Sequence, residues 1–418
     1  MKVLVLGGGA REHAICWSLA SSTLITKLYC APGNPGIEKE ALCVDLDIEN
    51  NKEVLDFAKK NKIDLVVPGP EIPLVNGIVD ELKQNKIRAF GPSKAAALLE
   101  GSKKFTKDIC NSAKIPTAKF NFFTEMAPAI KYLNTIAFPI VIKADGLAAG
   151  KGVTIAKDIN EAKEAVKNSF NGIFGTAGMK ILIEEFLEGP ELSYFALCDG
   201  KTAIPISNAQ DHKRVGENDV GPNTGGMGAF SPSQILTENL EHQIINKIIN
   251  PTLKELIKRG TPYQGVLYAG LIITKEGPKL IEYNVRFGDP ECQVLLTRMK
   301  SNLLEALIAS CDQTLESFNI RFFDESTLTV VMASKGYPGK YIKGSEISGI
   351  EEAEKIRDVK VFHAGTTKIN NILVSSGGRV LSVTSKAKTI EDARSLAYKA
   401  IKKIRWKDGF FRSDIGLK

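Results

Sequence analysis

Glu282 and Asn284 are two oxygen-bearing side chains separated by one residue within the largely apolar stretch 280–285. If this stretch is a β-strand, both side chains point to the same face, because side chains alternate along a strand. A carboxylate beside an amide oxygen, with no His or Cys close in sequence, suits Mg²⁺, which takes its remaining ligands from water and nucleotide phosphates. Arg286 follows on the same side and could neutralise charge on a phosphoryl group. These residues predict a metal–phosphate site; the alternative is an ordinary strand that ends in a polar turn.

A turn signal, residues 288–290, comes directly after Arg286. Gly and Pro at such positions change the direction of the chain. Three polar side chains could then surround the same site, namely Asp289, Glu291 and Gln293. The turn therefore favours the functional interpretation of the strand.

A glycine-rich loop at 145–152 follows an expected strand, 138–144, which carries Lys143 near its end. Another expected strand begins at Val153. A hairpin with such small residues can fold over phosphates as a lid and offer its amide hydrogens. It is not a Walker A loop, because its Gly-Lys pair is followed by Gly152 rather than Ser or Thr. The alternative is a hairpin that is simply flexible.

Further polar residues sit at the ends of other expected elements. Lys103, Lys104 and Lys107 lie in an expected helix, 93–112, where a solvated face is the alternative. The expected strand 180–187 ends in two carboxylates. Glu184, or the backbone beside it, could read the edge of an adenine, and Glu191 could hold ribose hydroxyls; spacing alone establishes neither.

The segment 210–228 is long, polar and rich in glycine, and so much irregular backbone in a compact domain is usually functional. Asp211, Lys213 and Arg214 suit a zwitterionic or phosphorylated substrate. The alternative for His212 is a loop histidine with its hydrogen bonds satisfied.

The start of the chain predicts a parallel α/β domain, with a strand at 2–6, a glycine loop at 7–9 and a helix at 12–22. A dinucleotide site is the first alternative, but the glycine spacing is not G-x-G-x-x-G and the second strand, 27–31, ends without an acidic residue. The loops at 31–36 and 68–71 follow strands, where open α/β sheets bind ligands. Each could also be a plain turn.

The later part of the chain predicts different elements. We expect a helix at 237–260 broken near Pro251, antiparallel strands at 265–273 and 279–285, and a helix at 302–310. From about Asp324 short strands alternate with Gly-rich turns. The last helix, from about Thr389, carries four basic residues that we interpret as a solvated face rather than a nucleic-acid patch: Lys399, Lys402, Lys403 and Arg405.

Composition limits the function classes. The 418 residues are enough for two to four domains, and 43% hydrophobic with 25% charged residues is ordinary for a globular protein. The net charge of +7 is spread along the chain, so it favours anionic small ligands as much as nucleic acid. Seven scattered Cys without a C-x-x-C pair indicate reduced thiols. With neither a signal peptide nor an apolar run of membrane-spanning length, the chain is expected to be cytoplasmic.

Taken together, the motifs resemble the phosphoribosylamine–glycine ligase family (glycinamide ribonucleotide synthetases) of the ATP-grasp superfamily. The resemblance spans nearly the whole chain and rests on Gly-Ala-Arg-Glu-His13, Ala-Pro-Gly-Asn34, Gly-Pro-Glu71, Lys-Ala-Asp-Gly-Leu-Ala-Ala-Gly-Lys-Gly152, Gln-Asp-His-Lys-Arg214, Gly-Pro-Asn-Thr-Gly-Gly-Met-Gly228 and Arg-Phe-Gly-Asp-Pro-Glu-x-Gln293. The Arg-Phe-Gly-Asp-Pro-Glu run is the most specific of these, whereas Gly-Gly-Gly and Gly-Pro-Glu are weak. Position 10 is Ala where the family often has Gly.

The resemblance implies a multidomain α/β and α+β fold. An N-terminal parallel α/β substrate-binding domain would cover 1–101, an ATP-grasp region 102–323 with a lid subdomain at about 120–188, and a small mixed β/α domain 324–418. It also implies ATP-dependent ligation of glycine to 5-phosphoribosylamine through glycyl phosphate, with Mg²⁺ or Mn²⁺, in the second step of de novo purine biosynthesis.

The family's roles can be carried over to matching residues. Lys103 and Lys143 would contact the ATP phosphates, and Lys103, Lys143 and Arg286 would be catalytic. The other nucleotide contacts would be Gly146, Gly150, Lys151, Gly152, Glu184, Glu185, Phe186, Leu187 and Glu191. The substrates would contact Gly9, Arg11, Asn34, Glu71, Asp211, Lys213, Arg214, Thr224, Gly225, Gly226, Arg286, Gly288 and Asp289. Glu282 and Asn284 would hold the metal.

Three other interpretations stay open at this point. A different ATP-grasp ligase or carboxylase of purine metabolism would share the ATP site and differ in the segment 210–228. A nicotinamide-dependent oxidoreductase would use the N-terminal glycine loop. A non-catalytic nucleotide-binding regulator would have no need of Glu282, Asn284 and Arg286. We expect small-molecule substrates, neither nucleic acid nor membrane as a partner, and a monomer or a weak dimer.

Overall fold

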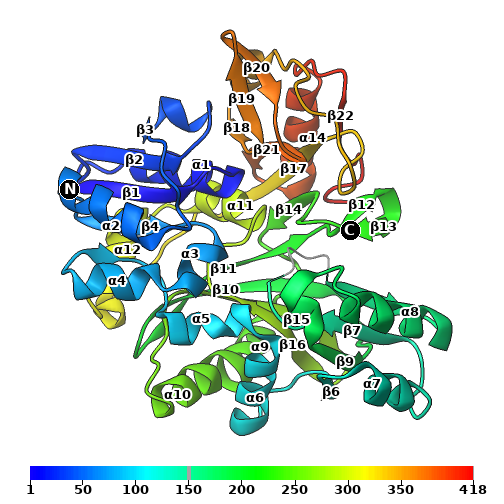
Figure 1. Ribbon diagram of the computed structural model, residues 1–418. Coiled ribbons are helices and arrows are strands. Elements are labelled where there is room, and N and C mark those ends of the chain that lie inside the picture. The colour runs from blue at the N-terminus through cyan, green and yellow to red at the C-terminus, as the bar shows by residue number, and fades with distance from the viewer. Residues whose placement is uncertain (148–151, 418) are drawn as a thin grey trace.

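The computed structural model describes residues 1–147 and 152–417 (Figure 1). Its N-terminal part is a five-stranded parallel sheet in the order β3-β2-β1-β4-β5. The apolar runs of β1 and β4 are buried on both faces, as parallel strands covered by helices require. The elements are β1 Lys2–Gly7, α1 Ala10–Ala20, β2 Lys27–Pro32, β3 Leu42–Cys43, α2 Asn51–Asn61, β4 Leu65–Pro68, α3 Glu71–Asn76, α4 Ile78–Gln84 and β5 Arg88–Ala89.

Two helices, α5 Lys94–Gly101 and α6 Lys103–Ala113, replace the single helix expected at 93–112. The break is at Ser102, whose extended backbone ends α5 and whose side chain caps α6 by accepting the Phe105 N–H. Ser102 Oγ also donates to the Asp145 carboxylate at 3.2 Å. An N-cap serine inside an apparently continuous helical pattern is a local signal that the pattern alone concealed.

A separate four-stranded antiparallel sheet, in the order β6-β9-β7-β8, carries the glycine-rich hairpin. Helices α7 Met126–Leu133 and α8 Ile159–Phe170 pack on it around their own apolar cluster, which includes Ile142, Val166 and Ile183. Its strands are β6 Phe120–Phe123, β7 Ile140–Ala144, β8 Val153–Ala156 and β9 Ile181–Glu185. The strands on both sides of the expected hairpin loop are thus present.

The largest sheet runs in the order β16-β15-β10-β11-β14-β17-β21-β18, and β22 Gly409–Phe410 also pairs with β17. It continues from the middle of the chain into the C-terminal part, because β14 pairs with β17. Its strands are β10 Glu191–Asp199, β11 Ala203–Asp211, β14 Gly228–Ser231, β15 Gln264–Thr274, β16 Gly277–Asn284, β17 Ser326–Ser334, β18 Val359–His363 and β21 Arg379–Ala387.

The remaining elements surround this sheet. Figure 1 places the N-terminal sheet on the left, the four-stranded sheet at the lower right and the C-terminal strands at the top. The helices are α9 Glu238–Ile244, α10 Asn250–Lys258, α11 Glu291–Arg298, α12 Leu303–Cys311, α13 Ile350–Glu354 and α14 Ile390–Ile401. Two small hairpins pair β12 Arg214–Gly216 with β13 Val220–Asn223 and β19 Thr366–Ile369 with β20 Ile372–Ser375. The expected multidomain combination of a parallel α/β part with antiparallel sheets is confirmed.

Two local expectations need correction. The segment 210–228 is less irregular than its composition suggested, because β12 and β13 form a hairpin inside it. The helix expected at 237–260 is interrupted by a π-helical turn, Ile245–Ile249, ahead of Pro251, which lies in the first turn of α10, where a missing N–H costs no hydrogen bond. No helix among residues 1–147 and 152–417 is long and apolar enough to cross a membrane.

Candidate active site

The strand β16 presents Glu282 and Asn284 on one face. They pair with Gly270 and Tyr268 of β15, while the next pair is Leu280 with Leu271, so the register skips Ile281. This β-bulge bends the strand next to the two oxygen-bearing side chains, as bulges beside active sites commonly do. Both side chains are half-buried, and Asn284 Oδ1 accepts a hydrogen bond from Arg286 Nη2 at 3.1 Å.

The donor set of β16 fits a metal that brings its own ligands. The described residues contain no group of three or more His, Cys, Asp or Glu side chains arranged to hold an ion. A carboxylate with an amide oxygen is incomplete as a cage, but Mg²⁺ binds through one or two protein oxygens together with water and substrate phosphates. Glu282 and Asn284 therefore suit a metal that arrives with a nucleotide.

Three lysines and one glutamate, which we call the lysine cluster, lie beside this strand: Lys103, Lys107, Lys143 and Glu184. Glu184 is buried between two of the lysines, with Oε2 at 2.9 Å from Lys143 Nζ and Oε1 at 3.3 Å from Lys107 Nζ. Lys143 Nζ also donates to Ile281 O at 3.3 Å, and Lys103 Nζ donates to Gly146 O at 3.0 Å. Residues from α6, β7, β9 and β16 thus meet at one place.

The lysine cluster holds more positive than negative charge in a poorly solvated place. Burial lowers the pKa of Lys103, and the nearby Glu282 carboxylate opposes that shift. Burial likewise lowers the pKa of Lys107, opposed by Glu184. An anion such as a phosphate would relieve the uncompensated charge, so the arrangement is suited to bind one.

Other residues predicted to contact a nucleotide lie around this cluster. Glu185 accepts the Lys119 N–H at 3.0 Å, and Phe186 is 36% exposed next to it. Glu191 is paired with Lys213 at 2.8 Å. Gly146 has a left-handed backbone, φ +122°, at the start of the glycine-rich loop. Gly152 lies directly before β8. Of the predicted residues in this loop, Gly150 and Lys151 lie outside the described residues.

Arg286 is the centre of a second group, the arginine cluster, which we define as Glu71, Glu100, Asn284 and Arg286. Arg286 Nε donates to Glu71 Oε2 at 2.9 Å, and Nη2 donates to Glu100 Oε1 at 2.8 Å as well as to Asn284. Glu100 Oε2 also accepts the Val285 N–H at 2.8 Å. The guanidinium is thereby fixed between the N-terminal domain, helix α5 and strand β16.

The pKa values of the two carboxyl groups in the arginine cluster are shifted in opposite directions. Burial raises the pKa of Glu100 and outweighs the attraction of Arg286. At Glu71 burial acts in the same direction, but Arg286 and Arg11 outweigh it and lower the pKa. Burial would lower the pKa of Arg286, yet Glu100 and Glu71 raise it, so this side chain stays charged.

The N-terminal glycine loop is organised by Glu12, which sequence reasoning did not select. Glu12 Oε2 accepts the Gly9 N–H at 2.6 Å, and Oε1 accepts Arg11 Nε at 2.6 Å. A Cβ atom at Gly69 would lie 2.1 Å from Glu12 Oε1, so the Gly-Pro-Glu loop passes this carboxylate with no room for a side chain. Arg11 Nη1 reaches Phe287 O at 3.2 Å, which links the loop to the residue after Arg286.

Asn34 lies at the same loops, but its side chain is occupied by hydrogen bonds to other residues of the protein. Its Nδ2 donates to Gly8 O at 2.9 Å and to His363 O at 2.8 Å. Its Oδ1 accepts the N–H groups of Gly36 and Ile37 at 2.9 and 3.0 Å. All of its donors and acceptors are thus engaged, so Asn34 shapes the glycine loop and ties it to the C-terminal part.

The predicted substrate residues from the end of β11 onwards make different contacts. Burial raises the pKa of Asp211 to about 7, and Lys213 opposes that shift. Arg214 Nη1 donates to Gly221 O at 2.8 Å within the β12–β13 hairpin, so the structure turns this guanidinium to its own hairpin. Thr224 Oγ1 donates to Lys213 O at 2.8 Å and accepts the Gly226 N–H at 3.0 Å, which closes the loop at 224–226.

Arg379, from the C-terminal strand β21, is a further residue that sequence reasoning missed. Its guanidinium donates to Gly225 O, to Asp289 O at 2.6 Å and to Asp289 Oδ2 at 2.7 Å. Asp289 Oδ1 accepts Gln293 Nε2 at 2.7 Å. The turn with Gly288 and Asp289 and the loop with Gly225 are therefore held together by one arginine.

The missed residues carried weak sequence signals. Glu12 lies inside the Gly-Ala-Arg-Glu-His13 motif, and Lys107 belongs to the lysine group whose alternative was a solvated face. Glu100 and Arg379 follow no chemical motif, because their partners lie 186 and 90 residues away. Only the fold brings those charges together.

The chain matches three family models in order. They are the N domain of phosphoribosylglycinamide synthetase at residues 1–100, its ATP-grasp (A) domain at 101–292 and its C domain at 327–418.

Relatives match over the full length. A phosphoribosylamine–glycine ligase of Mesorhizobium japonicum is 55% identical over 416 residues, which cover 100% of this chain and 98% of the relative. One from Escherichia coli (strain K12) is 48% identical over 421 residues, covering 100% and 98%. The crystal structure of phosphoribosylamine–glycine ligase from Thermotoga maritima superimposes with a TM-score of 0.87 at 31% identity, covering 99% of this chain and 100% of that one.

More distant structures share the fold alone. The biotin carboxylase domain of Hydrogenobacter thermophilus 2-oxoglutarate carboxylase, in complex with MgADP and bicarbonate, has a TM-score of 0.76 at 17% identity, covering 98% of this chain and 91% of that one. The full-length matches above go further. The chain belongs to the phosphoribosylglycinamide synthetase family, the phosphoribosylamine–glycine ligases with an ATP-grasp domain.

Proposed function

We infer that this chain catalyses the ATP-dependent ligation of glycine to 5-phosphoribosylamine, which gives glycinamide ribonucleotide, ADP and phosphate in purine biosynthesis. The observation that carries this inference is the hydrogen-bonded path from Glu71 through Arg286 to Asn284. It brings the N-terminal loops against the strand that is suited to a metal and a nucleotide. A ligase needs this proximity, because the activated carboxylate must meet the amine without diffusing away.

The reaction that we propose has two steps. A glycine carboxylate oxygen attacks the γ-phosphorus of ATP, and the bond to ADP breaks, which leaves glycyl phosphate. The amine of phosphoribosylamine then attacks the glycyl carbonyl carbon, the bond to the phosphate oxygen breaks, and the amine loses a proton. Neither step needs a covalent enzyme intermediate, so positioning and charge neutralisation carry the catalysis.

ATP would lie along the lysine cluster. Lys103 and Lys143 would contact its phosphates, and the hairpin at 146–152 would cover them. Adenine would pack at residues 184–187, where Glu184 Oε1 is buried and lies 3.3 Å from Lys107 Nζ. This oxygen could accept from the exocyclic amine of adenine. Glu191 would turn from Lys213 to the ribose hydroxyls.

A Mg²⁺ or Mn²⁺ ion would be held by Glu282 and Asn284, and when bound it would offset the negative charge of the phosphates. Lys103 lies close enough to Glu282 for that carboxylate to oppose the lowering of its pKa. We propose that Lys103 and Glu282 act on the same phosphate group from two sides.

The two substrates would lie towards the end of β16, where Arg286 contacts Asn284 and Glu71. We propose that Gly9, Arg11 and Glu71 contact phosphoribosylamine, with Asn34 acting through the glycine loop. Arg286 would stabilise the transferring phosphoryl group while Glu100 fixes its plane. The remaining substrate contacts would come from the two segments that Arg379 joins, and they comprise Asp211, Lys213, Thr224, Gly225, Gly226, Gly288 and Asp289. Arg214 would also contact a substrate, which requires that its guanidinium leave Gly221 O.

We propose that the chain divides into an N-terminal substrate-binding domain, 1–101, an ATP-grasp region, 102–323, with a lid subdomain at about 120–188, and a C-terminal domain, 324–418. We propose that the protein is a monomer or at most a weak dimer. Size-exclusion chromatography with light scattering would test that expectation: a stable dimer would contradict it.

The test of the function is ADP release from MgATP and glycine, with and without phosphoribosylamine generated from ribose 5-phosphate and ammonia. We expect ADP only when both glycine and the amine are present, with an equal amount of glycinamide ribonucleotide. ADP formation beyond about one equivalent per enzyme in the absence of the amine, or the absence of this product, would contradict the proposal. Other carboxylate and amine substrates would then be the next candidates.

A further inference from the structure

Lys107 is buried, and its ammonium group contacts four other residues. Its Nζ donates to Thr117 Oγ1 at 2.7 Å and to Ala118 O at 3.3 Å. It lies 3.3 Å from Glu184 Oε1 and 5.2 Å from the centre of the Phe120 ring. Its side chain is 3% exposed, so these groups, rather than water, must solvate the ammonium. A solvated face, the alternative from the sequence, does not describe this lysine.

The contacts of Lys107 lead to strand β16 by two routes. Through Glu184 they reach Lys143, whose Nζ donates to Ile281 O. Through Thr117 they reach Leu280 O, to which Thr117 Oγ1 donates at 2.7 Å. The two carbonyls are consecutive and adjoin the β-bulge that precedes Glu282. The bulge takes Ile281 out of the regular ladder, so its carbonyl needs another donor, and Lys143 supplies one.

Lys107 also changes the charge that Lys143 presents. With one lysine, the Glu184 carboxylate would neutralise Lys143 as a simple ion pair. With two lysines the carboxylate is shared, and the three side chains together keep one positive charge. That remaining charge is what a phosphate would meet at Lys143.

We propose that Lys107 is a positioning residue of the nucleotide site. It holds Glu184 and Thr117 so that Lys143 stays directed at the phosphates and β16 keeps the bulge that aims Glu282 and Asn284. Lys107 itself touches neither nucleotide nor metal. The inference rests on the proposed placement of ATP at Lys143 and Glu184.

The main test is Lys107→Met, which keeps the length of the side chain and removes its charge. We expect the KM for ATP and the Kd for ADP, measured by calorimetry, to rise about tenfold, because a charge-assisted contact to a buried carboxylate is lost. The KM values for glycine and phosphoribosylamine should change less than about twofold, because the residues proposed to bind these substrates share no partners with Lys107. A general loss of structure would raise all three KM values together.

A double-mutant cycle with Glu184→Gln separates positioning from direct binding. If Lys107 acts through Glu184 as well as through Thr117, Lys107→Met should weaken ADP binding only about threefold further in the Glu184→Gln background, which is the share expected for the Thr117 route. Full additivity of the two effects would overturn the proposal, as would an unchanged ADP affinity of Lys107→Met alone. Lys104→Met is the matched control, because Lys104 lies on the same helix, is 38% exposed and pairs with Asp108. It should leave ADP binding unchanged within about twofold.

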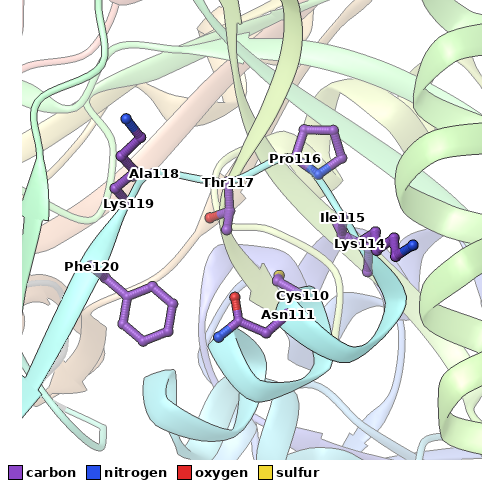
Figure 2. Close-up of a pocket in the computed structure, with 9 residues that line it drawn as sticks. All are labelled: Cys110, Asn111, Lys114, Ile115, Pro116, Thr117, Ala118, Lys119 and Phe120. Atoms are coloured by element: carbon purple, nitrogen blue, oxygen red, sulfur yellow. The ribbon is translucent and has the colours of Figure 1, made fainter.

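A second variant keeps the test decisive if Lys107→Met does not fold. Thr117→Val preserves the shape of the side chain and removes the hydroxyl between Lys107 and Leu280. Figure 2 shows Thr117 on the segment between the end of α6 and the start of β6. It is one of the residues that line a hollow of about 500 Å³. We expect the Kd for ADP to rise about threefold with an unchanged KM for phosphoribosylamine. An unchanged Kd for ADP would overturn the proposal.

These measurements keep the two proposals apart. One possible outcome is that Lys107→Met binds ADP more weakly while the wild-type protein forms no glycinamide ribonucleotide. That outcome would support this inference and contradict the proposed function. Normal product formation with unaltered ADP binding by Lys107→Met would do the reverse.

Discussion

The lysine cluster lies beside Leu280–Glu282 of strand β16 and the arginine cluster lies at the end of the strand, at Asn284, and the two are built differently. The lysine cluster comes from α6, β7 and β9, which lie within residues 103–185, and its single carboxylate is outnumbered by lysines. The arginine cluster comes from three parts of the chain, and its guanidinium is already paired with two carboxylates. One cluster is left with positive charge for an anion. The other is satisfied within the protein and joins domains.

This difference suggests two kinds of function for buried charge. Excess charge in a poorly solvated place is costly unless a ligand compensates it, so it favours binding. A satisfied charge network fixes the relative position of its members. Changes in the lysine cluster should therefore alter nucleotide binding, whereas changes in the arginine cluster should alter stability as well as activity.

The largest effect is expected where the two clusters meet, at β16. Glu282→Ala removes the only carboxylate of the proposed metal pair, and we expect ADP formation to fall by at least about a thousandfold, because charge stabilisation on the phosphates is lost. Circular dichroism and Tm should stay as in the wild type, since Glu282 is half-buried at a strand face. Glu276→Ala, on an exposed side chain of the same hairpin, is the control. Near-normal turnover of Glu282→Ala would refute the metal assignment.

Arg286→Met should affect both stability and activity. It leaves the Glu71 and Glu100 carboxylates without their shared partner, and breaking such a buried pair costs about 3 kcal/mol of unfolding free energy. Urea denaturation at neutral pH would measure this loss. The double variant with Glu100→Gln removes one of the stranded charges and should recover part of the stability while staying inactive. If Arg286→Met were as stable as the wild type, the arginine cluster would not join the domains as we infer.

Arg379→Lys should have a smaller effect, confined to the substrates. A lysine can replace one of the contacts to Gly225 and Asp289 but cannot bridge them as the guanidinium does. We expect the KM for phosphoribosylamine to rise about tenfold, with the Kd for ADP unchanged. Arg405→Lys, on the surface of the C-terminal part, is the matched control. A rise in the Kd for ADP would show that the nucleotide site and the substrate segments are not independent.

The smallest effects are expected in the pH dependence of stability, where the two carboxyls of the arginine cluster should act in opposite directions. The pKa of Glu71 is lowered from 4.5, so its contribution is present above pH 4.5 and is lost as the pH falls through the folded-state pKa. The pKa of Glu100 is raised from 4.5, so its ionisation opposes folding progressively as the pH rises above 4.5.

Urea denaturation of Glu71→Gln and Glu100→Gln between pH 4 and pH 7 would check these signs. Relative to Glu100→Gln, the wild type should gain stability as the pH falls towards 4.5. Relative to Glu71→Gln, it should lose stability below pH 4.5. Parallel curves for both variants would mean that the network does not separate the two carboxyls.

Features that depend on neighbours along the chain could be predicted from the amino-acid sequence. Alternation along a strand was enough to place Glu282 and Asn284 on one face, and apolar runs followed by glycines were enough to locate the N-terminal sheet and the hairpin after Lys143. Such patterns can be recognised because a strand has a period of two residues and glycine permits backbone shapes that other residues avoid.

The contacts between charges that are distant in the chain could not be predicted in this way, because they depend on how the chain folds. Glu100 and Arg286 are 186 residues apart, and Arg379 reaches Asp289 across 90 residues, so neither pairing has a local pattern. The burial of Lys107, the engagement of all hydrogen-bonding groups of Asn34 and the bulge at Ile281 also follow from packing between elements. The residue type gives the charge of a side chain, but its burial and its partners depend on the fold around it. Burial and partners determine whether the charge binds a ligand or holds domains together.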